Sequence, residues 1–304
     1  MAIVTAARYN ALQAKVANVM GNGSGTFGYG QSLESSQVAA STIIDSEHMA
    51  DIYTDMINAR VHQVGSVPNS VATVAAGNVI EEDSADTGTG RGIQQYEDLA
   101  TTIETDRALI YTADTSQSTI TTNQTSSTLT GSWNGTRDHV VTVTFASADA
   151  RRHFFNAGGE IRFTADLDPS ASNGKNNDWN NLLSAMGTVL FKGSATTSTG
   201  SGTGESVGNF NLTGTYQKCF QKDGSGVYAE NDWNLYAKEN STSVIEFRIQ
   251  FRDDDQGDDT NNDGAFNPID EDVSGVLDSV VGERLPTGSR VALTSPTYAT
   301  TNNL

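Results

Sequence analysis

The stretch His139-Val-Val-Thr-Val-Thr-Phe145 largely alternates polar and apolar side chains, as does Glu160-Ile-Arg-Phe-Thr-Ala165. A period of two residues is typical of β-strands that bury one face. Between these stretches, residues 147–157 predict a short helix, because Ser147 can cap its start and Gly158-Gly159 can end it. Thr, Ser and Val dominate from about residue 116 onward, so we expect this part of the chain to be mainly β-sheet.

Further elements are expected after these two strands. Residues 177–191 carry Trp179 and three other apolar residues at helical spacing, which predicts a second helix. Residues 193–208 contain almost only Gly, Ser, Thr and Ala, a composition typical of a flexible loop or tip. The remaining strands are expected at residues 210–220, 233–238, 243–251 and, closing the sheet, 291–293.

Three stretches in the first 115 residues have the apolar spacing of three and four that is typical of amphipathic helices. The first ends at Gly21, the second is capped by Asp45 or Ser46 and ends at Gly65, and the third follows a loop at residues 81–92. Their apolar faces carry Tyr9, Leu12, Val16 and Val19; Met49, Ile52, Tyr53, Met56 and Ile57; and Ile93, Tyr96, Leu99, Ile103 and Ile110.

These patterns together predict an α+β fold, with an N-terminal helical region followed by a mainly antiparallel β domain with short helical insertions. The expected division is a helical docking and oligomerisation region over residues 1–115 and a β-rich domain over residues 116–304. We expect the β-rich domain to contain the flexible loop at 193–208 and an acidic loop at 253–272.

The charge balance argues against a nucleic-acid partner. The net charge is −19, and phosphate affinity needs clustered Lys and Arg side chains. Arg151-Arg152 is the only adjacent basic pair, and we expect it to be the solvated start of an amphipathic segment. No run of about 18 apolar residues is present, and residues 1–9 lack a basic region followed by an apolar one, so we expect no membrane span and no secretory signal.

The residue types that carry catalysis are sparse and poorly spaced. The four histidines show no HExxH spacing, and no GxSxG motif is present. The single cysteine, Cys219, excludes an internal disulfide framework and is expected to be a small buried side chain. We therefore expect no enzymatic activity.

The glycine-rich loop at residues 21–30 invites comparison with phosphate-binding loops. It matches neither common template, because no Gly-Lys-Ser/Thr follows it and a helix rather than a strand precedes it. A loop that needs positive φ angles and lets a neighbouring subunit approach the backbone closely fits the sequence better.

The acidic loop matches the spacing of a twelve-residue calcium-binding loop. With Asp259 at position 1, Gly264 falls at position 6 and Asp270 at position 12, where a longer Glu is usual. Pro268 interrupts the pattern, so a structural Ca²⁺ site and a solvated acidic loop both remain open. The candidate ligands are Asp259, Asn261, Asp263, Ala265 through its carbonyl, and Asp270.

The N-terminal part of the chain has a helix, then the turn Gly28-Tyr29-Gly30-Gln31, then the helix Met49-Ala-Asp-Ile-Tyr-Thr-Asp-Met-Ile-Asn-Ala-Arg60, which ends in Val61-His62-Gln63-Val64-Gly65. In this order of elements it resembles virion structural proteins of T4-like marine and cyanobacterial myophages. The segments 137–145, 152–163 and 177–179 look like the β-rich part of the same proteins. The similarity spans most of the chain but includes no mechanistic motif, and the acidic loop has no place in the family pattern.

This resemblance implies a component of the neck, collar, tail or fibre attachment of a tailed bacteriophage, located in the virion and assembled in the host cytoplasm. The implied partners are copies of the chain itself and other virion proteins of the neck, tail or capsid, with no nucleic acid and no membrane. We expect a homo-oligomer that docks through its first 65 residues. The candidate interaction residues are Tyr29, Gln31, Tyr53, Arg60 and His62.

Two other classes of function remain as alternatives. A receptor-binding or glycan-binding module would use exposed aromatic side chains such as Trp133, Trp179 or Trp233, although each fits a core position better. A secreted calcium-dependent adhesin or surface-layer-type protein fits the acidity and the β content, but it would normally need an export signal.

Overall fold

The computed structural model describes residues 4–254 and 272–304, and its contacts divide the chain into two compact units. The helical unit combines Met1–Thr119, Asp149–Gly159 and Leu285–Thr294, and the sandwich unit takes Ile120–Ala148, Glu160–Arg284 and Ser295–Leu304. The two short later segments of the helical unit lie within the region that the sequence assigns to the β-rich domain. They join the helices because Ala157 and Val291 are buried in the helical core.

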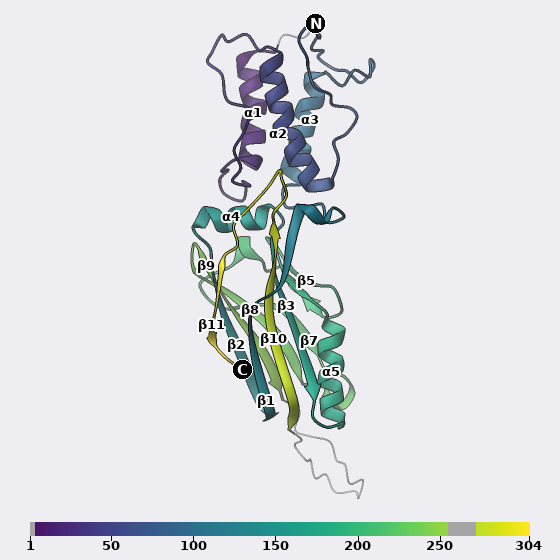
Figure 1. Cartoon of the computed structure of the whole chain (residues 1–304), viewed down its shortest axis with the longest axis vertical. Coiled ribbons are helices and arrows are strands. Elements are labelled where there is room, and N and C mark those ends of the chain that lie inside the picture. Colours follow the sequence, from purple (N-terminus) through teal and green to yellow (C-terminus); the bar gives the residue numbers. More distant parts are fainter. Residues whose placement is uncertain (1–3, 255–271) are drawn as a thin grey trace, which may run out of the picture. The chain divides into compact units, whose positions relative to one another are not determined.

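The helical unit is built around α1 (Ala6–Met20), α2 (Ser46–Val64) and α3 (Ile93–Thr105), which pack against one another (Figure 1). All of α4 (Ala148–Asn156) except its first residue also belongs to this unit. Asp45 caps α2, as its sequence predicts, by accepting hydrogen bonds from the backbone N–H groups of Glu47 and His48. Gly65 ends α2 with a φ of +82°. The α3 helix ends before Ile110, and the predicted apolar faces supply most of the buried core.

Two antiparallel sheets form the sandwich unit (Figure 1). The five-stranded sheet has the order β1 (Ser118–Trp133), β10 (Val273–Pro286), β3 (Glu160–Pro169), β4 (Val189–Phe191) and β5 (Thr196–Ser198). The six-stranded sheet has the order β11 (Thr297–Asn302), β2 (Gly135–Thr144), β9 (Val244–Asp253), β8 (Asp232–Ser241), β7 (Gln217–Asp223) and β6 (Thr203–Gly204). The remaining elements are α4 (Ala148–Asn156), α5 (Gly174–Met186), η1 (Thr115–Gln117), η2 (Asn209–Asn211) and η3 (Gly226–Tyr228).

Aromatic side chains fill the space between the sheets. The ring of Phe247 on β9 lies 5.0 Å from that of Phe163 on β3 and 5.0 Å from that of Phe191 on β4. Trp179 on α5 stacks edge-on against Trp133 at the end of β1, with centroids 5.2 Å apart. The model therefore confirms the α+β class, and it places all three tryptophans in the core, where they cannot serve as exposed binding groups.

Several sequence-based element boundaries were wrong. Residues 189–191 form β4 rather than the end of a helix, and the low-complexity stretch 193–208 contains β5 and β6. Residues 291–293 lie in the helical unit, so β11 is the strand that ends the sheet. Strands β1 and β10 were not predicted. In β1 there are too few apolar residues to show a period of two.

Candidate interaction surface

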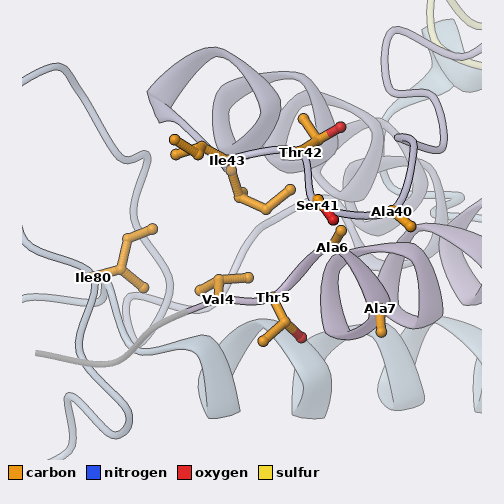
Figure 2. A pocket seen from close by; sticks show the side chains of 10 residues that line it. Val4, Thr5, Ala6, Ala7, Ala40, Ser41, Thr42, Ile43 and Ile80 are labelled. Atoms are coloured by element: carbon orange, nitrogen blue, oxygen red, sulfur yellow. The ribbon is translucent and has the colours of Figure 1, made fainter.

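An apolar groove lies where α1 begins (Figure 2). It has a volume of about 580 Å³ and is lined by two segments, residues 4–7 and residues 40–44, together with Ile80. Ile44 and Ile80 also pack against the core of the helical unit, so the groove is continuous with that core. Every side chain drawn in the groove is aliphatic, a serine or a threonine (Figure 2).

The side chain of Ile43 at the groove is 86% exposed, and Val79, next to Ile80, is 46% exposed. Single exposed apolar residues are common on protein surfaces, but here they adjoin a concave aliphatic lining. Burying an isoleucine side chain contributes about 1.5–3 kcal/mol. The groove therefore offers a partner a favourable contact that residues 4–254 and 272–304 leave unfilled.

The segment that carries Ile43 is fixed at several points before it reaches the groove. The buried carboxylate of Asp55 accepts hydrogen bonds from the backbone of Glu34 at 3.0 Å and from the backbone and hydroxyl of Ser35 at 2.9 and 2.6 Å. The side-chain amide of Asn10 then exchanges two 2.9 Å hydrogen bonds with the backbone of Val38. Because Asp45 caps α2 just beyond, both ends of this segment are held in place.

Arg8 on α1 fixes the other side of the same region. Its guanidinium contacts Glu97 on α3 at 2.8 and 2.9 Å and Glu82 in the preceding loop at 2.9 Å. The hydrogen bonds that Arg8 donates to Glu97 and then to Glu82 raise the pKa of Arg8 above its usual value. The bidentate contact with Glu97 ties α1 to α3 and draws the loop that carries Ile80 toward the start of α1.

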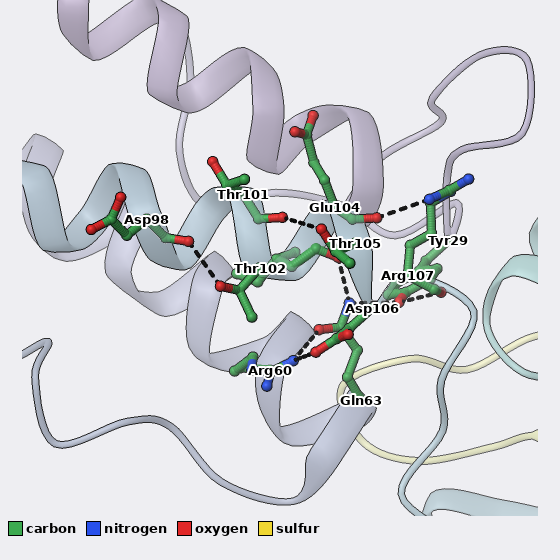
Figure 3. A network of polar contacts seen from close by, with 11 residues as sticks. Tyr29, Arg60, Gln63, Asp98, Thr101, Thr102, Glu104, Thr105, Asp106 and Arg107 are labelled. Atoms are coloured by element: carbon green, nitrogen blue, oxygen red, sulfur yellow. Dashed lines mark hydrogen bonds and ion pairs between the residues drawn. The ribbon is translucent and has the colours of Figure 1, made fainter.

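A second cavity of about 530 Å³ lies between the end of α2 and α3. Arg60 lines it and donates to Asp106 at 2.6 Å and to Gln63 at 3.1 Å (Figure 3). The guanidinium is thus engaged within the chain. This arrangement joins the ends of two helices and leaves Arg60 little freedom to reach a separate ligand.

Of the other predicted interaction residues, Tyr29 and His62 are fully buried in the helical unit. The Tyr29 hydroxyl donates to the Arg107 carbonyl at 2.6 Å and accepts from the Gln63 amide at 2.9 Å (Figure 3). The ring of His62 lies edge-on to that of Tyr29, with centroids 5.2 Å apart. Tyr29 and His62 therefore belong to the core of the helical unit and not to its surface. Direct contact with a partner stays a prediction for Gln31 and Tyr53, which are half-buried.

The glycine-rich loop packs against the chain's own α4, and close approach of a neighbouring subunit stays a prediction. Gly30 has a φ of +69°, and a Cβ atom there would lie 2.4 Å from Nδ1 of His153. Arg152 donates to the carbonyls of Phe27 and Asn22, both at 2.8 Å. The predicted positive φ is confirmed, but the expectation that Arg151-Arg152 is solvated was wrong, because Arg151 is buried and Arg152 binds the loop.

The predicted calcium ligands, Asp259, Asn261, Asp263, Ala265 and Asp270, lie outside the described residues. The flanking residues are well anchored. Beside them, Asn176 accepts from the Ser274 backbone at 2.8 Å, and Asn231 accepts from the Asp254 backbone at 3.0 Å. Within residues 4–254 and 272–304, no group of three His, Cys, Asp or Glu side chains could hold a metal ion. Calcium binding therefore stays a prediction from the sequence.

One constellation in the sandwich has the composition of a catalytic site. Nδ1 of His139 lies 2.9 Å from the Ser279 hydroxyl, and Nε2 lies 3.1 Å from that of Thr300. Both His139 and Ser279 are fully buried, so a substrate cannot reach the serine, and the third group is a hydroxyl rather than the carboxylate of a triad. Burial also raises the pKa of Cys219 to about 12, so this thiol is not a nucleophile at neutral pH.

Comparison with protein-family models, with curated proteins and with solved structures gave no match. Among the residues that the model describes, no helix combines the length and the apolar character of a membrane span. The site must therefore be judged on its geometry.

Sequence reasoning missed the aliphatic groove. Ile43 and Ile44 form an apolar pair in an otherwise polar connection, which is a local sign of contact with another surface. Val4 and Ile80 are far from them in the sequence, so only the packing of the helices shows that the three segments meet.

Proposed function

We propose that the chain is a non-enzymatic structural subunit of a larger assembly and that its helical unit docks through the aliphatic groove. The observation that supports this most directly is the 86% exposure of Ile43 beside an aliphatic lining of about 580 Å³. The anchoring by Asp55 and Asn10 supports it further, because a segment held in one conformation loses little entropy on binding.

We propose further that the assembly is the virion of a tailed bacteriophage, at the neck, collar, tail or fibre attachment, and that the chain acts there as a homo-oligomer. The residues that carry the resemblance include the α2 sequence, whose apolar face builds the core beside the groove. The high polar content and the net charge of −19 suit a soluble subunit that is stored before assembly.

The proposal can be tested by replacing Ile43 with Asp in the phage that encodes the chain. The Ile43 side chain is 86% exposed, so the Ile43→Asp variant should fold normally while its incorporation into purified particles, measured by mass spectrometry, falls at least tenfold. Val227→Asp is the matched control, because Val227 is 57% exposed in the sandwich unit, away from the groove residues in sequence. Particles that contain the Ile43→Asp chain at the normal level would contradict docking through the groove, and absence of the native chain from particles would contradict the virion assignment.

A further inference from the structure

The two sheets of the sandwich are joined along one side and open along the other. At the joined side, the backbone N–H of Thr196, the first residue of β5, donates to the Glu205 carbonyl at 3.0 Å. The Glu205 N–H in turn donates to the carbonyl of Cys219 on β7 at 2.9 Å. At the other side, β1 and β11 each have a single ladder neighbour among the described strands, β10 and β2. The open backbone edges of the sandwich are therefore those of β1 and β11.

These two edge strands contain no charged side chain and no proline. The 16 residues of β1 and the 6 residues of β11 lack Asp, Glu, Lys and Arg, although 18% of the whole chain is charged. Edge strands commonly carry Lys or Pro, or are very short, because an open edge can pair with another strand. β11 is short, but β1 is long and has none of these protections.

We propose that β1 pairs antiparallel, edge to edge, with β1 of a second copy of this chain. Pairing of one element with itself is closed by a two-fold axis, so it yields a dimer and not an open fibre. It would also join two five-stranded sheets into one continuous sheet.

The charge distribution favours a second copy as the partner. Two chains of net charge −19 repel each other, and an edge without charged side chains is where they approach at the least electrostatic cost. The nearest carboxylates lie one strand inward on β10 and are already held by β1. Gln124 donates to Glu283 at 2.8 Å, and the Thr128 hydroxyl donates to Asp278.

The side chains of β1 suit pairing between identical strands. Thr122, Ser126 and Thr130 are exposed, and Ile120 is 46% exposed. Threonine and serine side chains form favourable cross-strand pairs, and β-branched residues favour the extended backbone. On the inner face, the hydroxyls of Thr125 and Thr300 lie 2.9 Å apart, so β1 is held in an extended form before any pairing.

The first test is the molar mass of the purified full chain by sedimentation equilibrium. The apparent molar mass of the native chain should approach twice its 32.2 kDa as concentration rises. Thr122→Lys/Ser126→Lys places like charges on the paired edge and should raise the dimer dissociation constant at least tenfold. Ser206→Lys/Ala229→Lys changes the net charge equally at exposed positions outside both edges and should leave the constant unchanged.

The second test is disulfide cross-linking of the single variants Thr122→Cys, Ser126→Cys and Thr130→Cys. Buried Cys219 should not compete for oxidation. Antiparallel pairing about a two-fold axis predicts strong self-cross-linking at one position and weaker cross-linking at the others. A monomeric native chain, a dimer unaffected by the lysine pair, or equal cross-linking at all three positions would each overturn the proposal.

This inference deepens the proposed homo-oligomer by naming the surface that would form it. The β1 dimer and docking through the groove can each be contradicted without the other. The mass of the isolated chain tests the β1 edge, whereas incorporation of the Ile43 variant into particles tests the groove and the virion assignment.

Discussion

Nζ of Lys175 on α5 lies 3.2 Å from a carboxylate oxygen of Asp253 on β9, and both side chains are fully buried. An isolated charge in a protein interior is strongly unfavourable, so each of these groups depends on compensation from its surroundings. The pair joins the start of α5 to the end of β9, immediately before the acidic loop. It is therefore a structural connection whose loss should be measurable apart from any function.

We expect Lys175→Met to lower the free energy of unfolding by about 3–5 kcal/mol, because the buried Asp253 carboxylate would lose its contact with the Lys175 ammonium. The double variant Lys175→Met/Asp253→Leu should regain most of that loss, because it removes both charges and keeps comparable volume. Urea denaturation of the three proteins measures the difference. Equal stability of the single variant and the native chain would show that the pair is not energetically coupled.

Stability should fall in mild acid because two histidines are buried. Burial lowers the pKa of both His62 and His139 to about 4, from 6.5 in an unfolded chain. The unfolded state therefore binds more protons than the folded state between these pKa values. The contribution of the two histidines to the free energy of unfolding is fully present above about pH 6.5 and is lost as the pH falls toward 4. Each histidine contributes on the order of 3 kcal/mol to this change.

His139→Gln should remove part of that pH dependence, because an amide can still bond Ser279 and Thr300 but does not take up a proton. Thermal unfolding of the variant and the native chain at pH 7.5 and pH 5 measures the effect. The difference between the two pH values should shrink in the variant. An identical difference in both proteins would mean that His139 does not contribute.

Gly30→Ala should destabilise the helical unit more than Gly77→Ala does. Both glycines have positive φ, at +69° and +85°, so both substitutions incur a backbone cost of about 1–2 kcal/mol. Only at Gly30 would the new Cβ lie within 2.4 Å of the His153 ring, whereas nothing lies within 4 Å at Gly77. Melting temperatures of the two variants test this order, and a reversed order would refute the close packing of the loop on α4.

Asp55→Ala should loosen the segment that leads to the groove. Two backbone N–H groups and the Ser35 hydroxyl would lose their acceptor, at a cost of about 3 kcal/mol or more in total. Limited proteolysis should then cleave faster within residues 33–44. Asp51→Ala, one turn earlier on the same helix and partly exposed, is the control and should leave the cleavage rate unchanged.

The elements that the sequence predicts well are those whose determinants are local. The start of α2 is set by its cap Asp45, its end by Gly65, and its buried side by the apolar face between them. All of these signals lie in or next to the helix itself, so the bounds of α2 could be predicted to within a residue or two. Strand β1 was missed because its stability comes from β10, more than 140 residues later in the chain. Its alternating pattern is hidden by threonine and serine on both faces.

The candidate site was predicted in part only. The region near α2 was chosen from the sequence, but Tyr29 and His62 are buried there. The Tyr29 hydroxyl bonds Gln63 and Arg107, and Nε2 of His62 lies 3.0 Å from the Ala157 carbonyl. The groove depends on three segments that meet only after the helices pack. No spacing rule links Val4, Ile43 and Ile80, so periodicity alone could not reveal it.

The segment at residues 285–294 has a consequence for how the chain is made. Val291 completes the core of the helical unit, and Arg290 donates to Asn58 of α2 at 2.7 Å. A ribosome adds about 5–20 residues per second, so the three helices wait on the order of tens of seconds for this segment to emerge. Nascent chains that stop before residue 290 would carry an unfinished helical core, and they would be exposed to chaperones and proteases for that interval. Completion of the helical unit therefore waits until residues 285–294 have been synthesised.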